Sequence, residues 1–202
     1  MKFILGTKQN MTQLFDEEGK VHPVTVVKAE DLVVTQIKTK LKDGYEAIQV
    51  GFGTKKEKNI NKAQKGHMKD LGNFRHLKEI AGITEGTLGD KVESTLEAGD
   101  VVVVSAISKG KGFQGVVKRH GFHGGPRSHG QKHSEREPGS IGAGGYQRVF
   151  KGTRMPGRMG GDRVTVKNLV VMAYDKDTKE VYIRGAVPGR RGTLVEIQGE
   201  TL

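Results

Sequence analysis

The chain contains no cysteine and no tryptophan among its 202 residues. Without cysteine it can form neither a disulfide framework nor a thiolate metal site. Hydrophobic residues make up only 34% of the chain, and no apolar run approaches the roughly 20 residues needed to cross a bilayer. The apolar patch at residues 3–5 ends almost at once in polar residues. We therefore expect a soluble, cytoplasmic protein with no membrane partner.

Acidic residues are scarce in residues 108–161, and positive charge is concentrated there. This stretch holds eleven lysines and arginines but only Glu135 and Glu137, a net charge of +9 in a chain whose total is +11. It also holds 15 of the 30 glycines. So few large apolar side chains cannot bury enough surface to offset the entropy of ordering the backbone. We expect the stretch to be disordered on its own and to need a partner.

Dense positive charge on a flexible glycine backbone suits a polyphosphate, and therefore a nucleic acid. A solvated charged face is the simpler alternative, but like charges without counter-charges repel one another. The stretch lacks paired aromatics on a strand and any helix-turn-helix or zinc-finger pattern, which favours a compact folded RNA. The candidate RNA-binding residues are Lys109, Lys111, Lys118, Arg119, His120, His123, Arg127, His129, Lys132, Arg136, Arg148, Lys151, Arg154, Arg158 and Arg163. The glycines expected to let RNA approach the backbone closely are Gly110, Gly112, Gly124, Gly125 and Gly152.

Three patterns that could indicate catalysis, a cofactor or a metal are weaker. Residues 110–115 match GxGxxG after a strand, but the glycine-rich sequence that follows predicts no helix and hence no dinucleotide site. The histidines lie among arginines, which would repel a cation, so we expect no metal site. Serines 128, 134 and 140 lie near histidines without a positioned third group or a pocket. We therefore expect no enzyme activity, no cofactor and no small-molecule substrate.

Flanking this stretch, the pattern predicts short strands joined by turns, as in a small antiparallel barrel. Strands are expected at 2–5 and 13–15 around a turn at 6–10, then at 21–29 after a hairpin turn at 16–19, and at 32–39 and 45–52. Further on, a short helix is expected near 61–71 and a strand near 74–80. The predicted division is 1–53 as the first part of the barrel, 54–99 as a small α/β insertion, 100–107 as a barrel strand, 108–161 as the basic loop, and 162–202 as the last part of the barrel.

Several motifs in one order resemble the bacterial form of large ribosomal subunit protein three. They are FILGTKQNMTQLF, DGYEAIQVGFG, SKGKGFQGVVKRHGF, PGSIG, RVFKGTRMPGRMGG, RVTVKNL and RGAVPG, and they cover nearly the whole chain. The sequence departs from the family at residues 143–148, which replace a Thr-Pro-Gly step, and at residues 132–137, which are longer and more acidic. We transfer no glutamine methylation to Gln147, which does not align cleanly with the modified residue of some relatives.

This resemblance implies a six-stranded barrel like that of translation elongation factors, with a loop that penetrates 23S-type rRNA toward the peptidyl transferase centre. It also implies binding early in subunit assembly near the 3′ end of that rRNA, beside neighbouring large-subunit proteins and not as a homo-oligomer. The residues, taken without the resemblance, leave two other functions possible. One is an enzyme with a GxGxxG cofactor loop, and the other is a general nucleoid or mRNA-binding protein.

Overall fold

A computed structural model describes residues 2–81, 86–92 and 94–199, so residues 82–85 and 93 of the predicted insertion lie outside it. The described chain consists mainly of β-strands, and the predicted mainly β class is confirmed. It divides into two compact units. The first unit combines the residues up to 106 with those from 165 onward, and the second comprises residues 107–164.

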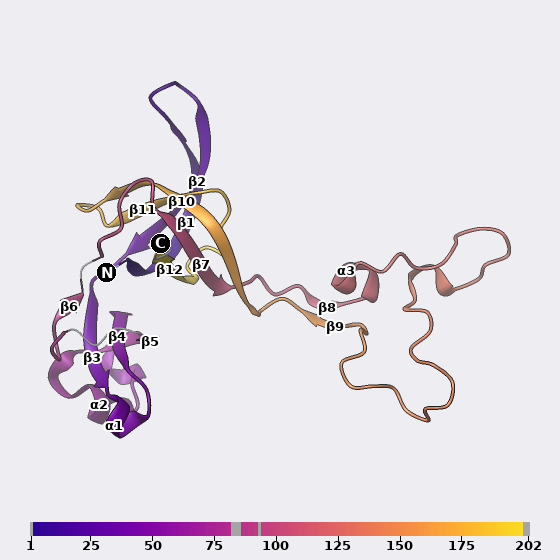
Figure 1. Ribbon diagram of the computed structural model, residues 1–202, viewed down its shortest axis with the longest axis horizontal. Coiled ribbons are helices and arrows are strands. Elements are labelled where there is room, and N and C mark those ends of the chain that lie inside the picture. Colours follow the sequence, from indigo (N-terminus) through magenta and orange to yellow (C-terminus); the bar gives the residue numbers. More distant parts are fainter. Residues whose placement is uncertain (1, 82–85, 93, 200–202) are drawn as a thin grey trace. The chain divides into compact units, whose positions relative to one another are not determined.

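Six strands of the first unit close into a barrel in the order β1–β12–β7–β10–β11–β2 (Figure 1). Both halves of the chain supply strands, because β12 pairs antiparallel with β1 and with β7. Thr165 at the start of β10 also contacts Ser105 of β7, with 2.8 Å between the hydroxyl oxygens. The strands are β1 (Phe3–Phe15), β2 (Val21–Ala29), β7 (Val101–Ile107), β10 (Arg163–Asp175), β11 (Glu180–Arg184) and β12 (Leu194–Gly199).

The barrel interior is filled by β-branched side chains. Alternate residues of a strand point to opposite faces of the sheet, so one set from each strand meets inside. Val102, Val104, Val181 and Ile183 are fully buried in this core. Their branched side chains fill a small barrel without polar atoms, which explains how a chain with so modest an apolar content holds one well-formed core.

A second sheet, in the order β5–β4–β3–β6, belongs to the first unit and lies outside the barrel. Its strands are β3 (Leu32–Lys38), β4 (Ala47–Thr54), β5 (Phe74–Ala81) and β6 (Lys91–Val92). The prediction that residues 1–53 all belong to the barrel is therefore wrong for β3 and β4. A period-2 pattern identifies a strand, but only pairing decides which sheet it joins, and β4 pairs with β3 and β5.

Strand β1 serves both cores. Ile4 points into the barrel, whereas Leu5, on the opposite face, packs with Val34, Val50 and Phe52 of the second sheet. Adjacent residues of a strand face opposite sides, so one strand can be buried on both. An ion pair between Lys78 of β5 and Glu196 of β12, 2.6 Å apart, also joins the second sheet to the barrel.

We expect Leu5→Ala to lower the free energy of unfolding by about 2–5 kcal/mol, the usual cost of a cavity at a fully buried leucine. Leu5 has no exposed surface and is the fully buried residue that β1 contributes to the second core. Chemical denaturation followed by circular dichroism measures this loss. Leu41→Ala is the control, because Leu41 is completely exposed. Equal stability of the two variants would mean that the second sheet does not depend on β1.

The predicted turn at residues 6–10 is wrong, because β1 runs unbroken through it with a register shift between Lys8 and Met11. Gly6 indicates close packing there, not a turn. A side chain at Gly6 would collide with Val27 and with the carbonyl of Lys28 on β2. A glycine inside a strand often marks such an approach of a neighbouring backbone.

The other local predictions hold. The hairpin turn at 16–19 joins β1 to β2, and Gly19 has a φ of 77°. Helix α2 (Lys62–Met68) lies in the predicted 61–71 region, and the Asn61 side chain caps it by accepting a hydrogen bond from the Gln64 amide at 2.7 Å. The predicted strand at 74–80 is β5. Between β3 and β4, α1 (Lys40–Asp43) ends at Gly44 in the left-handed conformation.

Candidate nucleic-acid interface

The second unit begins as a two-stranded ribbon, in which an outgoing arm, residues 108–114, lies against a returning arm, residues 157–162. The Ser108 amide donates to the Asp162 carbonyl at 2.8 Å, and the Lys111 amide donates to the Met159 carbonyl at 2.9 Å. Beyond them, β8 (Gly112–Gln114) pairs antiparallel with β9 (Gly157–Met159). Long irregular loops connect the helix that follows β8 to β9 (Figure 1). The outgoing and returning arms are thus held together by backbone hydrogen bonds and not by a hydrophobic core.

A short helix, α3 (Val116–His120), follows β8 directly, so the prediction that no helix forms in this region is wrong. Gly115 precedes the helix, and Gly121 ends it with a φ of 72° while its amide donates to the Val117 carbonyl. Such a left-handed glycine is a common helix terminator. Of residues 107–164, all of which the structure describes, only Val116 is a buried hydrophobic residue. Apolar burial in this unit is therefore limited to a single side chain.

Arg119 and His120 fasten this helix to the chain just before the returning arm. The guanidinium of Arg119 donates to the Met155 carbonyl at 2.6 Å, and His120 Nε2 lies 3.1 Å from the same oxygen. Gly157 makes room for this contact, because a Cβ there would lie 2.7 Å from Arg119 Nη1. Both residues were predicted to bind RNA. The structure gives them a role within the unit, which leaves the remaining guanidinium donors of Arg119 for a ligand.

The loop after α3 closes on itself at residues 124–135. The Gly125 amide donates to the Glu135 carbonyl at 3.1 Å, and the Glu135 carboxylate lies 2.8 Å from Arg127 Nη2. Carbonyl oxygens of Ser134 and Glu135 occupy the space where side chains at 125 and 124 would begin. The close approach expected of RNA at these two glycines is thus made by the chain itself. Gly110, Gly112 and Gly152 instead face open space.

Three aromatic rings of the second unit contact either an arginine guanidinium or another aromatic ring. The Arg154 guanidinium lies 4.9 Å from the Phe122 ring centre, and that of Arg148 lies 5.6 Å from the Phe150 ring centre. Tyr146 meets Phe150 edge to face at 4.9 Å. Phe122 and Arg154 also line a hollow of about 530 Å³ together with His120, His123 and Pro138. Stacked guanidinium groups hold their orientation while their outward donors stay available to phosphate.

Most candidate cations of the second unit have no counter-charge. Thirteen of the fifteen candidates are exposed, and the other two, Arg119 and His120, are partly buried. Arg127 is an exception to the lack of counter-charges, because it pairs with Glu135. The cations of this described segment that make no side-chain hydrogen bond, ion pair or ring contact are Lys109, Lys111, Lys118, Lys132, Arg136, Lys151 and Arg158.

Lysines of the first unit behave differently. Lys2 pairs with Asp100 at 2.5 Å, Lys38 with Glu79 at 2.7 Å and Lys65 with Glu57 at 2.6 Å. The hydrogen bond from Lys65 lowers the pKa of Glu57 below its ordinary value, and that from Lys38 does the same for Glu79. Outside residues 107–164 the chain has 22 basic and 20 acidic residues, so positive charge there is nearly balanced, whereas the second unit has a large excess of positive charge.

The structure gives the GxGxxG segment a different setting from a dinucleotide site. Such a site needs a parallel βαβ unit in which the helix follows the strand at a tight turn. Here the segment enters the antiparallel β8–β9 ribbon, and α3 has five residues. In the described ranges no group of three or more histidine or acidic residues is placed to hold a metal ion. No helix within the described part of the chain is long and apolar enough to cross a membrane.

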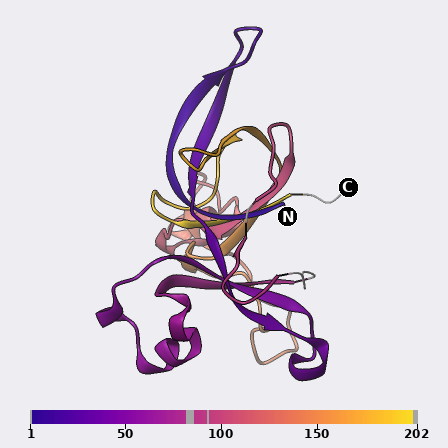
Figure 2. The same cartoon turned by 90° about the vertical axis from the view of Figure 1, so that its left-hand side faces the viewer.

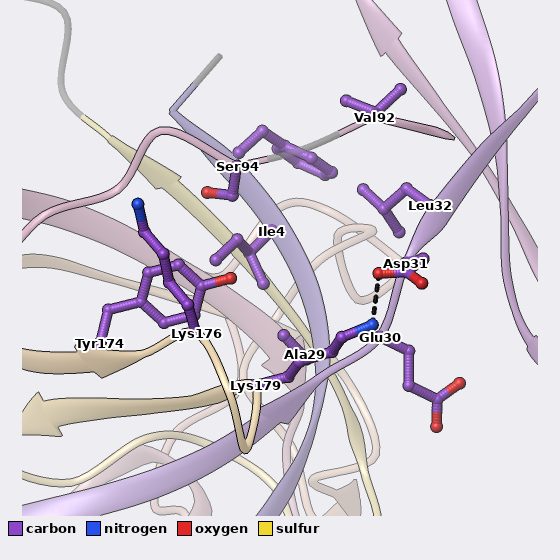
Figure 3. Close-up of a pocket in the computed structure, with 11 residues that line it drawn as sticks. Ile4, Ala29, Glu30, Asp31, Leu32, Val92, Ser94, Tyr174, Lys176 and Lys179 are labelled. Carbon is purple, nitrogen blue, oxygen red and sulfur yellow. Dashed lines mark hydrogen bonds and ion pairs between the residues drawn. The ribbon is translucent and has the colours of Figure 1, made fainter. Parts of the chain in front are cut away.

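The first unit contains a smaller hollow of about 210 Å³ beside the start of β1 (Figure 3). Ile4, Leu32 and Val92 give it apolar walls, and an ion pair between Asp31 and Lys179, 2.6 Å apart, lies at its rim. The hydrogen bond from Lys179 lowers the pKa of Asp31, so that this carboxylate stays ionised and paired. The residues that line the hollow include no histidine, and the Asp31 carboxylate among them is held by Lys179.

Sequence reasoning missed the glycines that hold the two arms together. Gly160 has a φ of 74°, and a side chain there would overlap the carbonyl of Lys109 on the opposite arm. Gly161 follows with a φ of 76°. The adjacent glycines at 160 and 161 were the available signal, because paired glycines often mark backbone that other residues cannot adopt.

Comparisons with known proteins agree over almost the whole chain. A family model described as Ribosomal protein L3 matches residues 79–183. Large ribosomal subunit protein uL3 of Herpetosiphon aurantiacus is 47% identical over 96% of this chain and 94% of its own length. The uL3 proteins of Finegoldia magna and Streptomyces coelicolor are 49% and 50% identical, each over 98% of this chain and 97% and 95% of their own lengths. These relatives are named as ribosomal proteins and not as enzymes. The chain belongs to the uL3 family of ribosomal proteins.

Proposed function

We propose that this protein is a structural constituent of the large ribosomal subunit that binds 23S-type rRNA directly through residues 107–164. The observation that carries the proposal is the set of exposed cations without counter-charges in that unit, whereas the rest of the chain has 22 basic and 20 acidic residues and is nearly neutral. A protein surface of this kind gains affinity by releasing the counterions of a polyphosphate. Family membership adds the ribosome as the place where such an RNA is found.

The same proposal covers the finer expectations. The barrel is of the elongation-factor type and anchors the protein, while the basic unit enters rRNA and supports the peptidyl transferase centre by holding RNA in place. Binding nucleates assembly near the rRNA 3′ end, beside other large-subunit proteins, as a single copy in the cytoplasm. Support comes from the lack of a hydrophobic core in residues 107–164, because a coreless basic segment gains order from the RNA it binds. The chain itself is not an enzyme, as its family indicates.

Sedimentation of cell extracts tests the assignment. We expect the chain to travel with the large subunit in a sucrose gradient and to stay there after a high-salt wash. High salt screens exposed charges but does not extract a protein whose extension lies inside folded RNA. Mass spectrometry of the fractions quantifies it against other large-subunit proteins, with equimolar amounts expected. A chain that washes off with salt would instead be a general nucleic-acid binder, and one found only among free proteins would overturn the proposal.

A further inference from the structure

The hairpin formed by β1 and β2 extends beyond the barrel, and one of its faces is exposed toward the turn (Figures 1 and 2). At the barrel end of this face Thr25 is buried, and its hydroxyl donates to the Gly185 carbonyl at 2.6 Å. Register places Phe15 directly opposite Val21, and Met11 opposite Thr25. Residues that are directly opposite, and residues two apart, share a face of the sheet. Met11, Phe15 and Val21 therefore share one face, and their exposed fractions are 51%, 64% and 48%.

The opposite face of the same hairpin is packed along β2. Leu14 pairs with His22 and Thr12 with Val24 in the register. His22 is only 7% exposed and Val24 is fully buried. The exposure of Phe15 and Val21 is thus not the fraying of a loose hairpin end, because their neighbours on the other face are held in place. Scattered exposed apolar residues are ordinary, but large ones that share one ordered face indicate an interaction surface.

The turn next to this face is acidic, although the chain as a whole is basic. Asp16, Glu17 and Glu18 lie in the turn with Lys20, whereas the chain as a whole carries a net charge of +11. The turn is ordered, because the Asp16 carboxylate accepts hydrogen bonds from the Lys20 amide at 2.8 Å and the Glu18 amide at 3.1 Å. His22 Nε2 lies 2.8 Å from the same carboxylate. Glu17 and Glu18 are left exposed beside Phe15.

We propose that this face of the hairpin, defined by Met11, Phe15 and Val21 and bordered by Glu17 and Glu18, docks a basic segment of another large-subunit protein that carries apolar side chains. The inference rests on the proposed ribosomal function and adds a protein contact to it. Apolar side chains would cover Phe15 and Val21, and lysines or arginines would meet the acidic turn. Complementary charges of this kind set partner choice and association rate more than total affinity.

The acidic turn argues against the two other occupants. RNA would bring phosphate against Glu17 and Glu18 and would gain no counterion release there. A second copy of this chain, docked face to face on a two-fold axis, would bring two acidic turns to the same interface and repel. A foreign basic segment avoids both penalties while burying the same apolar surface.

Photo-crosslinking in the assembled subunit tests the proposal. Phe15 is replaced by the photoreactive analogue p-benzoylphenylalanine, large subunits containing the variant are purified and irradiated, and the adduct is sequenced by mass spectrometry. We expect one adduct, to a lysine- or arginine-containing segment of another large-subunit protein. Leu41→p-benzoylphenylalanine is the matched control, because Leu41 is exposed and apolar but lies between Lys40 and Lys42. That position is expected to give no adduct to the same segment.

A second variant tests the charge complementarity. Glu17→Lys with Glu18→Lys, introduced beside the photoreactive residue, should reduce the protein adduct several-fold without changing thermal stability, because both side chains are exposed. An adduct to rRNA, to a second copy, or to no molecule in intact subunits would overturn the inference while leaving the ribosomal assignment standing. An unchanged yield in the charge-reversed variant would overturn the basic partner. Absence of the unmodified chain from the subunit would overturn both proposals.

Discussion

Replacing residues 112–157 by an Asn-Gly turn is expected to leave a folded protein that has lost almost all RNA affinity. The ends to be joined lie close together, because the Lys111 amide donates to the Met159 carbonyl and Gly112 pairs with Met159. Both hydrophobic cores are built from residues outside the deleted range. A two-residue turn matches the twist of an antiparallel ribbon. We expect stability to be unchanged or about 1 kcal/mol higher, since a shorter loop costs less closure entropy.

The expected loss of RNA affinity is large. The deletion removes eight of the eleven cations of residues 108–161 and keeps Lys109, Lys111 and Arg158. Six to ten phosphate contacts account for about a 10³- to 10⁵-fold dependence of affinity on salt, so we expect a loss of roughly 10³-fold near physiological salt. Filter binding to 23S-type rRNA measures it, and circular dichroism with thermal unfolding establishes that the barrel is intact.

Two results would contradict the assignment of RNA binding to residues 112–157 and of an independent fold to the first unit. Loss of the β signal in circular dichroism would show that residues 112–157 contribute to the fold of the first unit. Retention of wild-type RNA affinity by a folded variant would place the RNA-binding surface on the barrel. Each result has its own readout, so a failure of folding cannot be mistaken for a failure of RNA binding.

The basic unit could be predicted from sequence because composition is a local property. Charge and glycine content change abruptly near residues 108 and 161, and the second unit comprises residues 107–164. Hairpin turns were predictable for the same reason. The Asp-Glu-Glu-Gly turn at 16–19 depends on Asp16, whose carboxylate binds amides within four residues of it. Its pKa is lowered chiefly by the hydrogen bond with His22, another neighbour in sequence.

Sheet membership could not be predicted in this way. Strands β3 and β4 have the same alternating pattern as barrel strands, and their separate sheet is defined by β4 pairing with β5 some 25 residues later. Gly6 shows the same limit, because what excludes a side chain there is Val27 of a different strand. Arg119 was assigned to RNA by its charge, whereas its contact with Met155 depends on a chain reversal that no local pattern encodes. In all three cases the structure depends on contacts between residues that are far apart in the sequence.

The second large effect is expected from four cations of the second unit that make no contact within the chain. Replacing Lys111, Lys118, Lys151 and Arg158 with alanine should lower the slope of log affinity against log salt by about 3, at 0.7–0.9 for each lost phosphate contact. All four are exposed and none donates a side-chain hydrogen bond among the described residues. The fold should be unaffected, since exposed substitutions of this kind usually change stability by less than about 0.5 kcal/mol.

The control removes the same four charges from the first unit. Lys2, Lys65, Lys78 and Lys179 each pair with a carboxylate at 2.5 or 2.6 Å, so their charge is already compensated. Replacing these four with alanine should change the salt slope by less than about 1 and should cost at most about 1 kcal/mol of stability for each exposed pair. If total charge governed RNA binding, the two quadruple variants would lose affinity equally. A larger loss in the second unit would show that the placement of unpaired cations, and not the net charge of the protein, determines where RNA binds.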